Sequence, residues 1–76
     1  MESQEPVWTL GDRLLKARRA AELSQADLAK AIGVHRKSVT RWELGQSEPS
    51  ASLLIPLARA LGVSVAWLIG EDVHAA

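Results

Sequence analysis

Apolar residues recur along this chain at the three- and four-residue spacing of helices, in short stretches that end at glycine. The first stretch predicts a helix that begins after Thr9, because Thr9 and Asp12 have the spacing of a capping box. Its inner face is predicted to carry the apolar residues Leu10, Leu14, Ala17 and Ala21, with Leu15 adjoining. Its other faces are predicted to carry the cations Arg13, Lys16 and Arg19. This is the pattern of an amphipathic helix.

Two shorter helices are predicted next. Ser24 and Asp27 repeat the capping-box spacing and start a helix whose buried residues are Leu28, Ala29 and Ile32. Gly33 ends this helix, since glycine readily adopts the left-handed conformation that closes one, and Val34 supplies the apolar contact beyond it. His35 then caps a third helix, from Arg36 to about Leu44, with Val39 and Trp42 facing inward and Gly45 at its end.

The last third of the chain predicts two further helices. Ser50 or Ser52 caps one that runs to Leu61, with Leu54, Leu57, Ala58 and Leu61 facing inward. Because Pro56 lacks an N–H and collides with the preceding turn, the helix either bends there or starts late, at Ser52, and we expect the late start. Val63 enters the core, Ser64 caps a fifth helix from Val65 to Ile69, and Gly70 ends it. No strand-like alternation persists, so the sequence predicts an all-α fold of five helices.

Length and composition fit one domain. The 76 residues include no cysteine, and we expect a folded domain at 9–70, an N-terminal arm at 1–8 and a C-terminal tail at 71–76. A core this small depends on well-packed helices or on a partner subunit for its stability. The absence of cysteine and of a long apolar run favours a cytoplasmic location over secretion or membrane insertion.

The formal net charge is zero, but the charges are segregated along the chain. Residues 13–41 hold eight basic residues against Glu22 and Asp27, while both flanking segments are acidic. A molecule of this kind can present one positive face to the phosphates of a nucleic acid. The alternative is a set of solvated helix faces with no such partner.

The segment from Gln25 to Leu44 has the length of a helix-turn-helix. Ala29 is small where the two helices cross, Gly33 permits the sharp turn, and Val39 and Trp42 hold the second helix against the core. Its outward residues are predicted to be Arg36, Lys37, Thr40 and Arg41, with Ser38 near its start. Such side chains suit base edges in the major groove, which admits one helix.

The following residues carry a resemblance to a known family: Leu23 to Ala29, Gly33-Val34, Arg41-Trp42-Glu43, Gly45, Pro49 and Leu61 to Leu68. With these residues the chain resembles the phage repressor and Cro-like (XRE-type) helix-turn-helix family over roughly residues 10–70. The resemblance implies a five-helix lambda-repressor-like DNA-binding domain. It also implies a transcriptional regulator, usually a repressor, that binds double-stranded DNA as a homodimer on a palindromic operator.

The resemblance also implies residue roles. Arg36, Lys37 and Arg41 would read bases with Thr40 in support, and Gln25, Ser24, His35, Ser38 and Gln46 would contact phosphate. Gln25 and His35 have helix capping as their alternative role, and Ser38 could instead tighten the first turn. Arg18 and Glu43 would form a partly buried ion pair. The Gln46 to Pro49 loop departs from the family pattern, because it lacks Lys and Arg and contains Glu48.

The sequence is also compatible with functions other than operator binding. The chain has no catalytic motif, metal-ligand spacing or cofactor-binding loop, so we expect neither an enzyme nor a cofactor. An antitoxin or adaptor of the same fold, with a protein as its main partner, is the main alternative, and an excised domain of a longer regulator is another. Ile55, Trp67 and Ile69 exceed what one small core needs, so they are assigned either to a dimer contact or to core packing.

Overall fold

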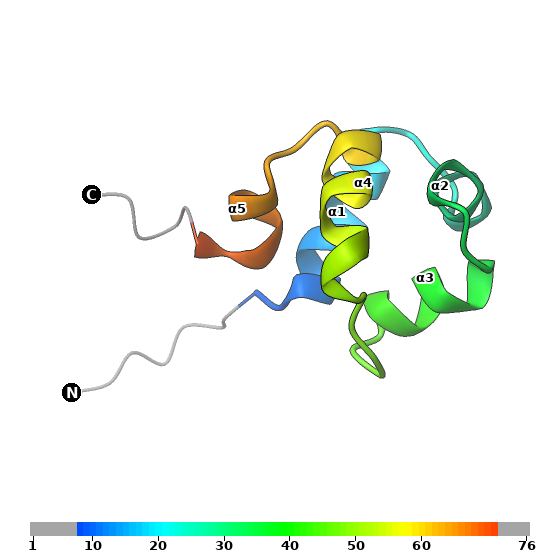
Figure 1. Ribbon diagram of the computed structural model, residues 1–76, viewed down its shortest axis with the longest axis horizontal. Helices are drawn as coiled ribbons and strands as arrows, with labels where there is room; N and C mark the ends of the chain where they lie inside the picture. The colour runs from blue at the N-terminus through cyan, green and yellow to red at the C-terminus, as the bar shows by residue number, and fades with distance from the viewer. Residues whose placement is uncertain (1–7, 72–76) are drawn as a thin grey trace.

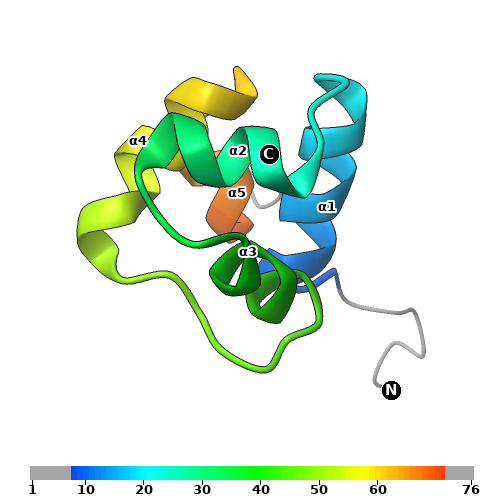
Figure 2. The same ribbon diagram turned by 90° about the vertical axis from the view of Figure 1, so that its right-hand side faces the viewer.

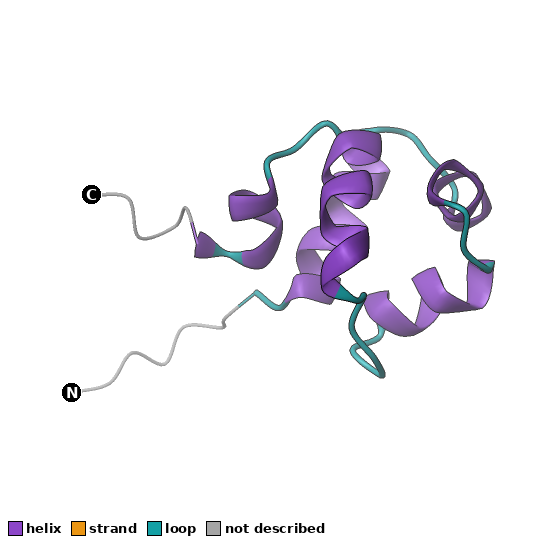
Figure 3. Ribbon diagram, viewed as in Figure 1, coloured by secondary structure: helices purple, strands orange, loops and turns teal. Residues whose placement is uncertain are grey.

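The computed structural model describes residues 8–71, which form five α-helices and no strand (Figures 1 and 3). The helices are α1 (Leu10–Ala20), α2 (Gln25–Ile32), α3 (Arg36–Glu43), α4 (Ala51–Leu61) and α5 (Val65–Ile69). The predicted all-α fold is therefore confirmed. Apart from Trp8 and Glu71, the predicted N-terminal arm and C-terminal tail lie outside the described residues.

Local side-chain chemistry sets most helix boundaries. The Thr9 and Asp12 pair and the Ser24 and Asp27 pair both form reciprocal capping boxes. Ser64 accepts a hydrogen bond from the Trp67 backbone N–H at the start of α5. At the other ends, α2, α4 and α5 close on glycines in the left-handed conformation, as predicted.

The core takes one fully buried side chain from each helix. These are Leu14, Leu28, Val39, Leu57 and Leu68, in chain order. Burial of a side chain of this size stabilises the fold by roughly 1.5–3 kcal/mol. In Figure 2, α2 and α3 lie in front, α1 and α4 stand on either side, and α5 lies behind. Among residues 8–71, every helix is too short or too polar to span a bilayer.

The predicted faces of α1 were wrong at two residues. Arg13 is buried, at 8% exposure, because its Nη1 donates to the Trp67 carbonyl oxygen at 3.0 Å and its guanidinium lies 5.2 Å from the Trp67 ring centroid. Its long side chain thus joins α1 to α5. Ala21 is exposed, because α1 ends at Ala20 and the chain turns away through Glu22, whose φ is 58°.

The predicted late start of α4 was also wrong. The helix begins at Ala51 with Ser50 as its N-cap and continues through Pro56. A proline at this place removes the hydrogen bond to the carbonyl of Ser52, in the first turn. Ser52 is exposed, so water can bind that carbonyl, and Leu53 and Leu54 near the start of the helix pack against the core.

Candidate nucleic-acid interface

A tight turn fixes the angle between α2 and α3. Gly33 adopts the left-handed conformation, with φ 74° and ψ 34°, and the Val34 backbone N–H donates to the carbonyl of Ala29 at 2.9 Å. Val34 is partly buried against the core, and Ala29 is buried in α2. The segment Gln25–Glu43 therefore has the helix-turn-helix geometry that the sequence predicted (Figure 2).

α3 has an inner and an outer face. Val39 and Trp42 are buried, while Arg36, Lys37 and Arg41 are exposed and Thr40 is half-buried. The predicted base-reading residues therefore lie on the side of α3 that the protein leaves open. The one acidic residue of α3, Glu43, points instead toward α1.

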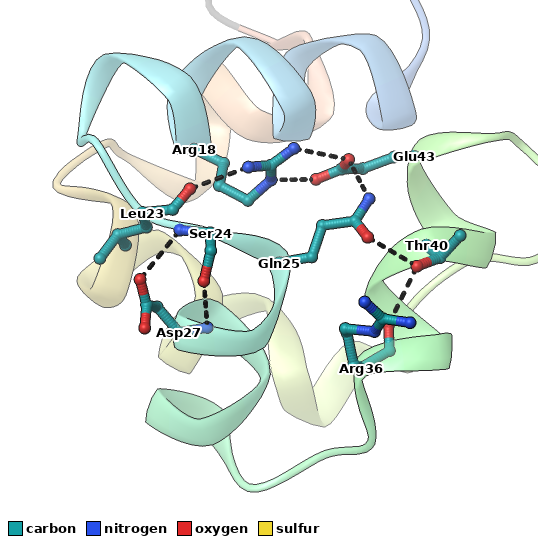
Figure 4. Close-up of polar contacts among 8 residues, drawn as sticks. All are labelled: Arg18, Leu23, Ser24, Gln25, Asp27, Arg36, Thr40 and Glu43. Atoms are coloured by element: carbon teal, nitrogen blue, oxygen red, sulfur yellow. Dashed lines mark hydrogen bonds and ion pairs between the residues drawn. The ribbon is translucent and has the colours of Figure 1, made fainter.

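A partly buried ion pair joins α1 to α3, as the resemblance implied. Arg18 Nε donates to Glu43 Oε2 at 2.6 Å, and Arg18 Nη2 donates to Glu43 Oε1 at 3.1 Å (Figure 4). The two side chains are 12% and 5% exposed. The hydrogen bonds to Glu43 raise the pKa of Arg18, and they outweigh the opposing effect of burial. Removing one partner of such a pair costs about 3–5 kcal/mol.

Arg18 also holds the segment that leads into α2. Its Nη1 donates to the carbonyl oxygen of Leu23 at 2.8 Å (Figure 4). One guanidinium therefore fixes the end of α3 and the approach to α2 together.

Gln25 links α2 to α3, and the sequence did not predict this. Its Nε2 donates to Glu43 Oε1 at 2.9 Å, and its Oε1 accepts from Thr40 Oγ1 at 2.8 Å (Figure 4). Ser24, rather than Gln25, provides the side-chain cap of α2. The only sequence signal for the link was the placement of two hydrogen-bonding residues on facing helices.

The other predicted phosphate contacts surround the exposed face of α3. His35 caps α3, with its Nδ1 accepting from the Lys37 backbone N–H at 3.2 Å, as predicted. Ser38 is half-buried in the first turn, and Gln46 is exposed in the loop that follows α3. Within residues 8–71, no group of three or more His, Cys, Asp or Glu residues is arranged to hold a metal ion.

Gly11 is a further structural residue that the sequence did not single out. It is buried in α1 where that helix crosses the end of α3. A Cβ at this position would lie 2.4 Å from the carbonyl oxygen of Trp42. The absence of a side chain at Gly11 is therefore a condition for the approach that lets Arg18 reach Glu43.

Comparison with known proteins decides the family. The family profile described as helix-turn-helix matches residues 14–68. The chain belongs to this helix-turn-helix family. The similarity to phage repressors inferred from the sequence is thereby confirmed.

Three of the proteins to which this chain is similar are a transcriptional regulator, an antitoxin and a phage repressor. The HTH-type transcriptional regulator DicA of Escherichia coli strain K12 is 36% identical over 64 residues, which are 84% of this chain and 47% of DicA. Antitoxin HigA1 of Mycobacterium tuberculosis strain H37Rv is 38% identical over 61 residues, 80% of this chain and 41% of HigA1. The chain thus spans less than half the length of either relative. The family is one of DNA-binding transcription regulators rather than enzymes.

The third is a solved structure, the P22 c2 repressor protein in complex with a synthetic operator. It has a TM-score of 0.81 and 30% sequence identity, and the match covers 87% of this chain and 100% of that chain. The five-helix lambda-repressor-like fold is therefore shared with a DNA-binding repressor domain.

Proposed function

We propose that this chain is a sequence-specific double-stranded DNA-binding module of a transcriptional repressor, and that it reads the major groove with α3. The observation that carries the proposal is the exposed face of α3, where Arg36, Lys37 and Arg41 project while Val39 and Trp42 fix the opposite face. Major-groove guanines offer O6 and N7 to such donors. The operator complex of the similar P22 c2 repressor supports the same use of the fold.

Phosphate contacts would orient α3 on the duplex. The backbone N–H groups at the start of α2 favour an anion, and Ser24 and Gln25 lie there. His35, Ser38 and Gln46 lie at the start of α3 and in the loop that follows it. Contacts of this kind fix register without reading sequence. We expect the protein to perform this function in the cytoplasm.

The proposal includes a homodimer on a palindromic operator. Ile55 and Ile69 are 56% and 46% exposed, so both offer apolar surface to a second copy. Trp67, which was assigned to the same contact, is half-buried and stacks on Arg13. In such a dimer the two α3 helices would lie about 34 Å apart, one turn of DNA.

Selection from a random duplex pool tests the proposal. We expect an enriched inverted repeat whose affinity falls linearly on a plot of log K against log salt. Arg41→Ala should weaken binding to the selected site by about 1–3 kcal/mol and relax the preference at one base pair.

Arg59→Ala is the matched control. Arg59 is an exposed arginine in the last turn of α4, at the end remote from the loop that follows α3 (Figure 1). Its loss should leave the sequence preference unchanged. Base reading by Arg41 would be contradicted if Arg41→Ala weakened binding to the selected and the random duplexes by the same factor, or if its effects did not differ from those of Arg59→Ala.

A protein-binding antitoxin is the second candidate, favoured by the similarity to HigA1. In that case the main partner is a protein and DNA binding is secondary. Affinity for a protein partner need not follow the salt dependence of phosphate binding, so the salt slope separates the two functions.

A further inference from the structure

A chain of hydrogen bonds crosses three helices and ends at the candidate DNA-reading face (Figure 4). It runs from Arg18 in α1 to Glu43 in α3, from Glu43 to Gln25 in α2, and from Gln25 to Thr40, back in α3. The donor-to-acceptor distances are 2.6 Å for Arg18 Nε to Glu43 Oε2, 2.9 Å for Gln25 Nε2 to Glu43 Oε1, and 2.8 Å for Thr40 Oγ1 to Gln25 Oε1.

The chemistry of these groups permits one direction only. A guanidinium can only donate, and the carboxylate paired with it can only accept. Because Glu43 accepts, the end of Gln25 that faces it must be the NH₂ group, and the carbonyl oxygen of Gln25 must face Thr40. Thr40 must therefore donate its single hydroxyl proton to Gln25.

The other neighbour of the Thr40 hydroxyl imposes the same direction. The carbonyl oxygen of Arg36 lies 3.3 Å from Thr40 Oγ1, and it too is an acceptor. Whichever of the two oxygens receives the proton, that proton is bound by a protein acceptor and is not free to donate to DNA. A threonine hydroxyl without such neighbours rotates freely and can either donate or accept.

We propose that Thr40 contacts DNA only as a hydrogen-bond acceptor, so that it selects a base with an exocyclic amino group, adenine or cytosine, on the strand it touches. Adenine N6 and cytosine N4 donate in the major groove. Guanine O6 and N7 and thymine O4 are acceptors, and Thr40 has no free proton to donate to them. This inference rests on the proposed function, because it names the base chemistry that the same face reads.

The buried part of the hydrogen-bond chain, at Glu43 and Arg18, keeps this donor-to-acceptor direction fixed. Glu43 is 5% exposed, so water competes little for its oxygens. Arg18 holds both carboxylate oxygens while Gln25 binds one of them. A pair located outside the DNA-reading face thus sets the hydrogen-bonding character of a residue on that face.

Base analogues in the selected duplex test the inference. Replacing adenine by purine, or cytosine by 2-pyrimidinone, removes the amino group. At the one position that Thr40 contacts, loss of the amino group should weaken binding of the wild-type protein about three- to ten-fold. Thr40→Val should weaken binding of the unmodified duplex by a similar factor, and its affinity should then be the same for the analogue duplex. Thr40→Ser should restore the loss of affinity that the analogue causes.

Two results would overturn the inference. One is that Thr40→Val makes binding insensitive to a 7-deazapurine substitution. That substitution removes an acceptor from the base, so Thr40 would then be the donor. The other is the absence of coupling at every position. Failure of the proposed function would differ from failure of this inference, because no duplex would then be selected at all.

The free protein offers an independent check of the hydrogen-bond chain. Gln46 is an exposed glutamine in the loop after α3 and serves as the matched control. The side-chain amide protons of Gln25 should exchange with solvent several-fold more slowly than those of Gln46. Equal exchange rates would contradict the hydrogen bonds on which the inference depends.

Discussion

Gly11 shows how one residue sets the distance between two helices. A Cβ there would lie 2.4 Å from the carbonyl oxygen of Trp42 and 3.0 Å from that of Glu43. Both neighbours are backbone atoms, which cannot swing aside as a side chain can. The position therefore excludes even the smallest side chain unless α1 and α3 move apart.

For Gly11→Ala, two effects have opposite signs. Helix propensity alone would stabilise the protein by up to about 1 kcal/mol, whereas overpacking costs about 1–3 kcal/mol. Because the overlap is with backbone, we expect net destabilisation in urea unfolding. Arg19→Ala, at an exposed position of α1, should change the free energy of unfolding by at most about 0.5 kcal/mol. A Gly11→Ala protein as stable as the wild type would contradict the close approach.

Single residues also show where sequence reasoning stops. The outward face of α3 was predictable, because burial of Val39 and Trp42 leaves the other side exposed. Arg13 was not, because a long side chain can bury its charge beside a tryptophan ring when a carbonyl oxygen accepts from it. Gln25 was assigned to phosphate or to helix capping, and its links to Thr40 and Glu43 were missed because these partners are 15 and 18 residues away in the sequence.

At the scale of elements, helix boundaries were predicted well wherever they depend on neighbouring residues. The caps at Thr9, Ser24, His35 and Ser64 act within three residues of themselves. The start of α4 has no such local signal, because Ser50 is its N-cap residue but makes no side-chain capping hydrogen bond. Leu53 and Leu54 pack against the core from the start of the helix despite Pro56, and the sequence pattern identified only Leu54 as inward-facing.

The capping box of α2 leads to a prediction about pH. The Ser24 backbone N–H, with a smaller contribution from the Ser24 side chain, lowers the pKa of Asp27. A carboxyl group with a lowered pKa in the folded state stabilises that state fully above the pKa of the unfolded chain. This stabilisation is lost as the pH falls through the lower, folded-state pKa.

An NMR titration of the Asp27 carboxyl measures the effect. Its midpoint should lie below the ordinary aspartate value of about 3.9. Ser24→Ala should raise the midpoint only part of the way, because the backbone N–H makes the larger contribution. A midpoint at the ordinary value in the wild-type protein would contradict the capping box.

At the scale of the whole molecule, a net charge of zero conceals a positive face. α3 has three exposed cations, and its single carboxylate is turned inward and paired with Arg18. The sequence revealed the charge segregation, but only the structure places Glu43 away from the open side. The arrangement that removes a negative charge from this face also braces the helix that carries it.

The central claim is that the outer face of α3 lies in the major groove. Intermolecular nuclear Overhauser effects on a complex with the selected duplex test it most directly. We predict contacts from the side chains of Lys37, Thr40 and Arg41 to cytosine H5 and thymine methyl protons, which line the major groove. Contacts to adenine H2, in the minor groove, or contacts from the outer face of α1 alone would contradict the account.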